Sequence, residues 1–122
     1  MAKRDLTIRP ICSNDEAVWR QLWNGYLDYY ETALPDEVYR STFARLLTGA
    51  PDGISGFLAV LNGIPVGLVH FLYHPSSWKV EGVCYLQDLF TLPEARGTGV
   101  AQALIRAVYA AADAAGVRDV YW

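Results

Sequence analysis

Hydrophobic and polar residues alternate at the start of the chain and then recur at helical spacing. Leu6-Thr7-Ile8-Arg9 alternates and stops at Pro10, as expected for a short first strand. Ser13, with Glu16 three residues later, predicts a capping box that opens the first helix. The apolar positions of this helix are Val18, Trp19, Leu22, Trp23, Tyr26, Leu27 and Tyr30.

A second helix and a hairpin are predicted next. The helix begins at Pro35-Asp36-Glu37 and ends at Gly49, which is a common helix stop. Its inward-facing positions are Val38, Phe43, Leu46 and Leu47. Two apolar strands follow, Phe57–Leu61 and Val66–Tyr73, and the Asn62-Gly63 pair between them favours a tight hairpin turn.

The remaining third of the chain reads as loop, strand, helix and strand. A loop is predicted over His74–Trp78 and a central strand over Val83–Thr91. A helix is expected from Thr98 to Ala115, where Gly116 stops it, and Arg118–Trp122 begins another strand. The sequence therefore predicts one α/β domain of the α+β type over residues 1–122, with the element order β-α-α-β-β-β-α-β.

Composition and charge exclude several classes of function. Hydrophobic residues make up 52% of the 122 and charged residues 19%, which is typical of a globular domain. The net charge is −3 and the chain has no basic run, so neither nucleic acid nor an anionic membrane is an expected partner. Cys12 and Cys84 lie far apart, and with two histidines they form no metal-binding pattern. Cys84 is expected to be a buried apolar residue, and the protein is expected in the cytoplasm.

The segment from Leu86 to Ala101 carries the clearest chemical signal. It reads as a buried strand, a short loop and a glycine-rich turn that opens into an alanine-rich helix. The first amides of a helix have no internal acceptor, and glycines let a bound group approach them, so this turn suits a phosphate or pyrophosphate. It is not a G-x-G-x-x-G dinucleotide-binding fingerprint, because Gln102 occupies the position of the third glycine. It is not a P-loop either, because a P-loop needs a lysine and the chain has none after Lys79. The alternative is that two glycines merely start a helix.

The turn resembles a known family. Arg96-Gly97-Thr98-Gly99-Val100-Ala101 is similar to the R-x-x-G-x-G/A signature of the GNAT superfamily of N-acetyltransferases, and Leu86–Leu92 resembles its central strand. Pro93-Glu94-Ala95 resembles the connecting loop. The resemblance covers the whole chain and implies a mixed, mostly antiparallel sheet flanked by helices. A complete member would continue with a helix and two strands, so the fold is expected to be truncated after its fifth strand, as a fragment or as a chain completed by another.

The resemblance implies binding of acetyl-CoA, without a metal, and transfer of its acetyl group to a primary amine. The pantetheine arm would bond to the main chain of Leu89, Phe90 and Thr91. The pyrophosphate would lie over the amides of Gly97, Thr98, Gly99, Val100, Ala101 and Gln102. Arg96 has two open interpretations, attraction to a phosphate and a salt bridge within the loop.

Acetyl transfer needs a donor for the developing oxyanion and a group that removes a proton from the amine. The main-chain amide of Leu89 or Phe90 is the expected oxyanion donor, because the central strand bulges there in this family. Asp88 is the candidate base or water-orienting group, and a structural hydrogen bond is its alternative role. Gln87 is expected to face the opposite side of the strand. The general acid is often a tyrosine on the family's final helix, so neither Tyr109 nor Tyr121 is assigned this role.

The acceptor pocket is expected at the loop between the first two helices. Tyr29, Tyr30 and Glu31 are its candidates, with Trp78 a weaker one, because aromatic faces and a carboxylate suit an alkylammonium group. Trp19 and Trp23 are interpreted as helix core, and His70 and His74 as structural residues.

Three functions are compatible with these residues. A small-molecule amine is the favoured acceptor. A protein acetyltransferase acting on lysine or N-terminal amines is an alternative, and so is a non-catalytic acyl-CoA-binding module. A homodimer is a further expectation.

Overall fold

The computed structural model describes residues 5–50 and 53–122. These residues form a five-stranded sheet in which the strands lie in sequence order. Its strands are β1 (Leu6–Pro10), β2 (Ile54–Leu61), β3 (Ile64–Ser76), β4 (Lys79–Thr91) and β5 (Val120–Tyr121). Neighbouring strands from β1 to β4 are antiparallel, and β5 pairs with β4 in parallel. The predicted mixed, mostly antiparallel sheet and the predicted order of elements are confirmed.

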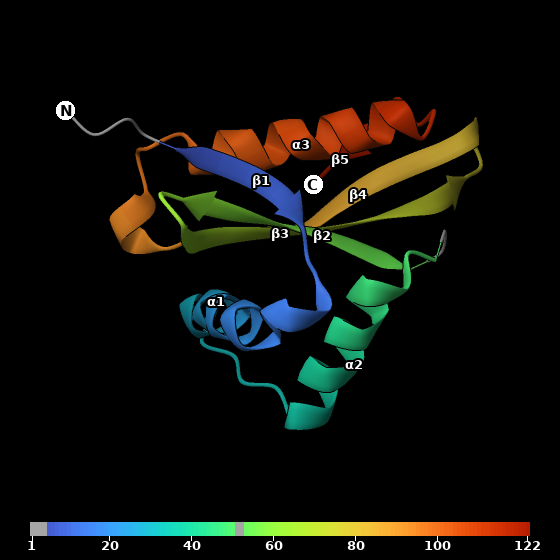
Figure 1. Ribbon diagram of the computed structural model, residues 1–122. Helices are drawn as coiled ribbons and strands as arrows, with labels where there is room; N and C mark the ends of the chain where they lie inside the picture. The colour runs from blue at the N-terminus through green and yellow to red at the C-terminus, as the bar shows by residue number, and fades with distance from the viewer. Residues whose placement is uncertain (1–4, 51–52) are drawn as a thin grey trace.

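Helices cover both faces of this sheet. Helices α1 (Glu16–Tyr29) and α2 (Asp36–Thr48) lie against one face, and α3 (Val100–Ala114) lies against the other (Figure 1). Short 3-10 turns, η1 (Ser13–Asp15) and η2 (Pro93–Ala95), lead into α1 and toward α3. None of the helices in the described residues is long and apolar enough to cross a membrane.

Each face of the sheet has its own hydrophobic core. Trp19 and Trp23 are buried between α1, α2 and the sheet, with 0% and 7% of their surface exposed, which confirms their interpretation as core. The α3 side buries Cys84 together with the apolar face of the helix, as predicted for this cysteine. Strands that are covered on both faces are apolar nearly throughout, which explains the runs in the sequence.

The predicted capping box at Ser13 and Glu16 is wrong by one residue at each end. Cys12 is the residue that caps the turn, and its amide donates a hydrogen bond to Asp15 Oδ2 at 2.7 Å. Arg9 accounts for the shift, because its guanidinium holds the same carboxylate through Nη1 at 2.8 Å and Nη2 at 2.9 Å. Asp15 is therefore buried with its charge paired.

The predicted loop over His74–Trp78 is too long, because β3 continues through Ser76 and only Ser77 and Trp78 form the turn before β4 begins at Lys79. A proline interrupts the hydrogen bonds between two strands only where its position would have to donate an N–H to the neighbouring strand. Here the pairing passes from His74 to Ser76 and leaves Pro75 without a partner, so the hairpin tolerates it. The Asn62-Gly63 hairpin is confirmed, and both of its residues have the positive φ that a type I′ turn requires, 52° and 83°.

Candidate functional site

Strand β4 contains a bulge immediately before Asp88. Asp88 pairs with His70 and Leu86 pairs with Phe71, so Gln87 is an extra residue without a partner in β3. A bulge of this kind shifts the alternation of main-chain groups by one residue and bends the strand. The bulge that the family resemblance implies is therefore present in this strand.

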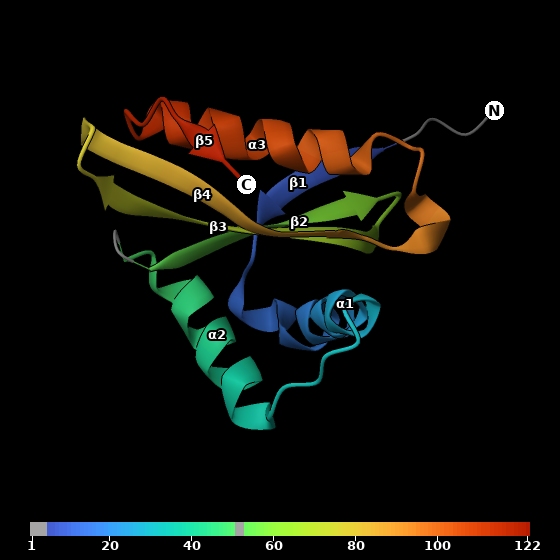
Figure 2. The same cartoon turned by 180° about the vertical axis from the view of Figure 1, so that it is seen from behind.

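The outer edge of β4 is free beyond the bulge. Strand β5 pairs with β4 only at Cys84 and Tyr85, so within the described residues no strand covers that edge from Leu86 onward (Figure 2). The amide of Leu92 donates to the Val66 carbonyl in β3 at 2.8 Å. Main-chain groups alternate in direction along a strand.

This alternation decides which amides are free. Because Leu92 faces β3, the amides of Leu89 and Thr91 point to the open edge, and the amide of Phe90 points into the sheet. Of the two expected oxyanion donors, only Leu89 therefore has an amide directed away from β3. Thr91 has the same direction and lies two residues closer to the glycine turn.

The glycine turn after η2 presents a second set of amides. Gly97 and Gly99 have φ values of 78° and 84°, a left-handed conformation that strains residues with a side chain. Helix α3 begins at Val100, and its first hydrogen bond runs from the Ala103 amide to the Gly99 carbonyl. Residues 96–99 form a turn, but in the described part of the chain no close hydrogen bond uses the amides of residues 97–102. Amides at the positive end of a helix can hold an anion, so the geometry of this turn fits the predicted phosphate site.

The side chains around this turn fit coenzyme A. A cavity of about 390 Å³ lies over it, lined by Thr91, Arg96 and the residues of the turn. The Thr91 hydroxyl is buried and has no hydrogen-bond partner among the described residues, so it is available to a bound group. Arg96 Nε donates to the Thr91 carbonyl at 3.3 Å, and no salt bridge among residues 5–50 and 53–122 includes Arg96. The salt-bridge interpretation of Arg96 is therefore not supported. Thr98 turns its hydroxyl to the Ala95 carbonyl, so it offers only its amide.

A second cavity joins the open edge of β4 to helix α1. Its volume is about 320 Å³, and it includes Tyr29 and Tyr30 together with Leu89 and Arg96. Tyr30 and Leu89 also line a neighbouring hollow of about 250 Å³ that extends to Gln87. Two of the expected acceptor residues are thus beside the free amide of Leu89.

The other two acceptor candidates lie elsewhere. Glu31 is exposed and lines neither hollow, and its φ of 54° carries the chain away from α1. Trp78 is at the turn between β3 and β4, with 90% of its surface exposed. The structure therefore does not bring Glu31 or Trp78 to the tyrosine cavity.

Asp88 precedes Leu89 in β4 but does not line this cavity. Its Oδ2 is 2.9 Å from His70 Nδ1, and its side chain keeps 16% of its surface exposed. Tyr26 lines both hollows. Burial first, and then the interaction with the Asp88 carboxylate, raise the pKa of Tyr26 above its usual range.

Sequence reasoning missed Tyr26 and His70. Tyr26 belongs to the helical stripe that also holds the buried tryptophans, and periodicity alone does not separate a cavity wall from a core position. Gly25 is the sequence feature that could have indicated the position of Tyr26. A Cβ at Gly25 would lie 2.8 Å from Cζ of Phe90 in β4. A glycine in the middle of a helix can mark such a close approach to a neighbouring element. This approach brings Tyr26 onto β4.

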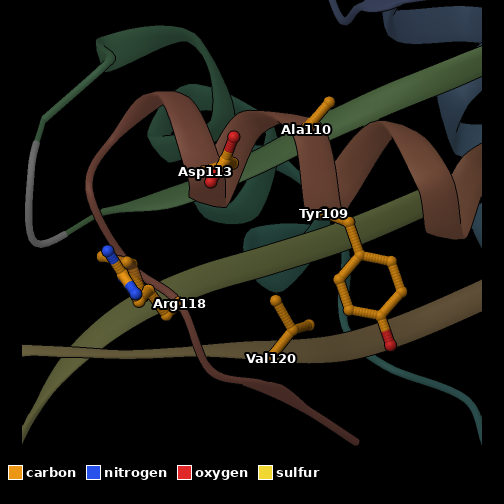
Figure 3. Close-up of a pocket in the computed structure, with 6 residues that line it drawn as sticks. Tyr109, Ala110, Asp113, Arg118 and Val120 are labelled. Atoms are coloured by element: carbon orange, nitrogen blue, oxygen red, sulfur yellow. The ribbon is translucent and has the colours of Figure 1, made fainter.

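A further hollow lies between α3 and β5 and is separate from this site (Figure 3). Its volume is about 510 Å³; Tyr109 reaches into it from α3, and Asp113 of the same helix also lines it. None of the residues predicted to bind a substrate lines it. The residues predicted to bind acetyl-CoA lie instead at the open edge of β4 and the adjoining turn.

Known proteins resemble this chain in sequence and in fold. The family model described as "Acetyltransferase (GNAT) family" matches residues 19–122. D-amino-acid N-acetyltransferase HPA3 of Saccharomyces cerevisiae is 37% identical over 124 residues, covering 100% of this chain and 76% of the relative. The aminoglycoside acetyltransferase AAC(6')-Iy with a bisubstrate analogue superposes with a TM-score of 0.82 at 23% identity, over 96% of this chain and 78% of the other. The structure of the same enzyme with CoA superposes with a TM-score of 0.76 at 25% identity, over 98% of this chain and 76% of the other.

The match extends over most of the chain and includes β4, the glycine turn and α3. The relative's identity is well above the level at which only a fold is shared. The chain therefore belongs to the GNAT acetyltransferase family and is an N-acetyltransferase that uses acetyl-CoA.

Proposed function

We propose that this enzyme acetylates the amino group of small amines of the amino-acid class, with D-amino acids as its best acceptors. The observation that carries this proposal is the 37% identity to a D-amino-acid N-acetyltransferase along the whole chain. The dimensions of the site support it, because the tyrosine-lined hollows measure about 320 and 250 Å³. The likeness to aminoglycoside acetyltransferases at 23% identity supports only the shared fold.

The main chain would hold acetyl-CoA. The amides of residues 97–102 would bind the pyrophosphate, and the Thr91 main chain and hydroxyl would contact the pantetheine arm. Bound there, acetyl-CoA supplies an activated acetyl group as a thioester. The Leu89 amide, which faces the open edge, would stabilise the negative charge that develops on the thioester oxygen.

The amine must lose a proton before or during its attack, since free alkylamines are largely protonated near neutral pH. Asp88 is the carboxylate closest to the site on β4, and it would take this proton through Tyr26 or through an intervening water. The faces of Tyr29 and Tyr30 would hold the substrate ammonium before it reacts. Glu31 is left out of this site because it does not line the cavity.

The proposal is tested by measuring thiol release from acetyl-CoA with a panel of acceptors. The panel contains D- and L-amino acids, a polyamine, an aminoglycoside and a lysine-containing peptide. We expect D-amino acids to give the highest kcat/KM, by about 10-fold or more, a difference of roughly 1.4 kcal/mol in transition-state binding. A higher kcat/KM for the peptide or the aminoglycoside would contradict the proposed acceptor.

Asp88→Asn serves as the site variant in this panel, and Glu81→Gln is the matched control. Both substitutions remove a carboxylate from β4, and Glu81 is exposed far from the cavity. We expect Asp88→Asn to lower kcat by about 100-fold or more, as for loss of a general base, and Glu81→Gln to leave it unchanged. Equal rates for the two variants would remove Asp88 from the reaction.

We also propose that the protein forms a homodimer. Exposed aromatic side chains support it, since Tyr121 and Trp122 keep 45% and 68% of their surfaces exposed. Light scattering would test this, since a monomeric mass at assay concentration contradicts it. The cytoplasmic location stays a prediction from the sequence.

A further inference from the structure

Asp88 is the end of a buried chain of hydrogen bonds that crosses from α1 to β4. Trp19 Nε1 donates to His70 Nε2 at 2.9 Å, and His70 Nδ1 lies 2.9 Å from Asp88 Oδ2. Trp19 and His70 are almost fully buried, with 0% and 1% of their surfaces exposed. Burying such a chain of polar groups destabilises the folded state unless each donor meets an acceptor.

The Trp19 indole fixes the proton on His70. An indole N–H can only donate, so the imidazole Nε2 facing it must be an acceptor without a proton. The proton of the neutral ring is therefore on Nδ1, which donates to the Asp88 carboxylate. A doubly protonated ring would direct its Nε2–H against the indole N–H. His70 thus donates to Asp88 through Nδ1.

The surrounding structure prevents His70 from turning away. The Trp19 and Trp23 rings lie against the imidazole, with centroid separations of 6.0 and 5.9 Å. The pairing of His70 with Asp88 is also the last one before the Gln87 bulge, so the strand register sets both side chains on the same face. Packing and register therefore impose one geometry on the carboxylate.

We propose that Trp19 and His70 are positioning residues for Asp88, and this rests on the role proposed for Asp88 above. The His70 hydrogen bond occupies Oδ2, and the Trp19 hydrogen bond holds the His70 ring in place. The second oxygen, Oδ1, is thereby left to receive the proton of the amine. His70 does not carry that proton further, because Trp19 occupies the nitrogen that would release or accept it. Partners of this kind, which act through another residue, alter activity when they are removed.

The first test is a set of variants measured for kcat and for KM of acetyl-CoA. Trp19→Phe/His70→Phe removes both partners without leaving a buried donor alone. We expect kcat to fall by about 10-fold or more while KM for acetyl-CoA stays the same. Trp19→Phe/His70→Asn should recover part of this kcat, because an asparagine amide again offers an N–H to Asp88.

Combining the Trp19→Phe/His70→Phe variant with Asp88→Asn distinguishes a positioning effect on Asp88 from a general effect on the structure. If His70 acts only through Asp88, adding Trp19→Phe/His70→Phe to Asp88→Asn lowers kcat no further. A loss that adds in full, or a normal kcat for the double variant, overturns the positioning role while leaving the function of Asp88 intact. A normal kcat for Asp88→Asn itself overturns the role of Asp88, and the positioning proposal fails with it.

A measurement on the unaltered protein covers the case in which these variants do not fold. Nitrogen NMR of the histidine rings distinguishes a protonated ring nitrogen from an unprotonated one. We expect His70 to carry its proton on Nδ1 and none on Nε2. A proton on Nε2 would contradict the arrangement with Trp19 and would overturn the proposal.

Discussion

The Leu92 amide donates a hydrogen bond to the Val66 carbonyl at 2.8 Å, and this bond sets the direction of every amide between the bulge and the end of β4. Leu92 faces β3, so the Leu89 amide faces away from it. Without the extra residue at Gln87, the alternation would be reversed. The free amide beside the tyrosine cavity is thus a consequence of one inserted residue.

Leu89→Pro tests the oxyanion donor, because proline lacks the amide hydrogen. The Leu89 amide makes no ladder bond to β3, so we expect the variant to fold and to bind acetyl-CoA. Its kcat should fall by about 100-fold or more, as when a single oxyanion donor is lost. Steady-state kinetics and calorimetry with acetyl-CoA would check both expectations.

Leu89→Ala is the control for the lost side chain, and it keeps the amide. Phe90→Pro is the control for position, because it removes an amide that points to β3 and should destabilise the protein. If Leu89→Pro and Leu89→Ala have the same kcat, the amide of Leu89 is not the donor.

Gly99→Glu tests the anion site at the start of α3. A carboxylate at this position would occupy the positive end of the helix and repel a pyrophosphate. We expect the affinity for acetyl-CoA, measured by calorimetry, to fall by about 10-fold or more. Gly99→Asn is the control, because asparagine tolerates the left-handed conformation and brings no charge. Equal affinities for the two variants would move the pyrophosphate away from this turn.

Tyr26→Phe tests the burial of the tyrosine hydroxyl through the pH dependence of stability. Burial raises the pKa of Tyr26, so the unfolded chain loses this proton first as the pH rises. The stability that the neutral hydroxyl contributes is complete below the unfolded pKa of about 10 and is lost above it. Urea unfolding from pH 8 to 11 should show the unaltered protein losing stability more steeply than Tyr26→Phe at the alkaline end. Parallel pH profiles would contradict the raised pKa.

Asp15→Asn tests the ion pair that corrects the predicted capping box. The hydrogen bond from Arg9 lowers the pKa of Asp15, so its stabilising effect is present above the unfolded pKa and is lost as pH falls through the folded one. We expect a loss of about 1–2 kcal/mol in the free energy of unfolding at pH 7, shrinking at pH 3. Asp36→Asn breaks an exposed pair with Arg20 and should have a much smaller effect. Equal losses at both pH values would contradict this linkage.

The order of elements and the glycine turn could be predicted because each has a local signal. Asn62-Gly63 imposes its own turn, and the glycines at 97 and 99 are followed at once by an alanine-rich helix. The errors arise where a distant residue decides the outcome. Arg9 selects Asp15 over Glu16, and the unpaired position of Pro75 lets β3 continue.

The parts of the site that were missed depend on contacts between distant elements. His70 reads as a histidine in an apolar strand, and only the fold brings Trp19 to one of its nitrogens and Asp88 to the other. Tyr26 reads as core because its helical stripe also contains buried tryptophans. No local pattern encodes either contact, since 51 and 18 residues separate the members of the two His70 hydrogen bonds.

The most direct test of the account is an amide NMR titration of the 15N-labelled protein with acetyl-CoA. We expect the largest shifts at Leu89 and Thr91 and along residues 97–102, whose amides are free. The amide of Phe90, which faces β3, should move less than its two neighbours. Shifts confined to the hollow between α3 and β5, with none along β4 and the glycine turn, would contradict the site.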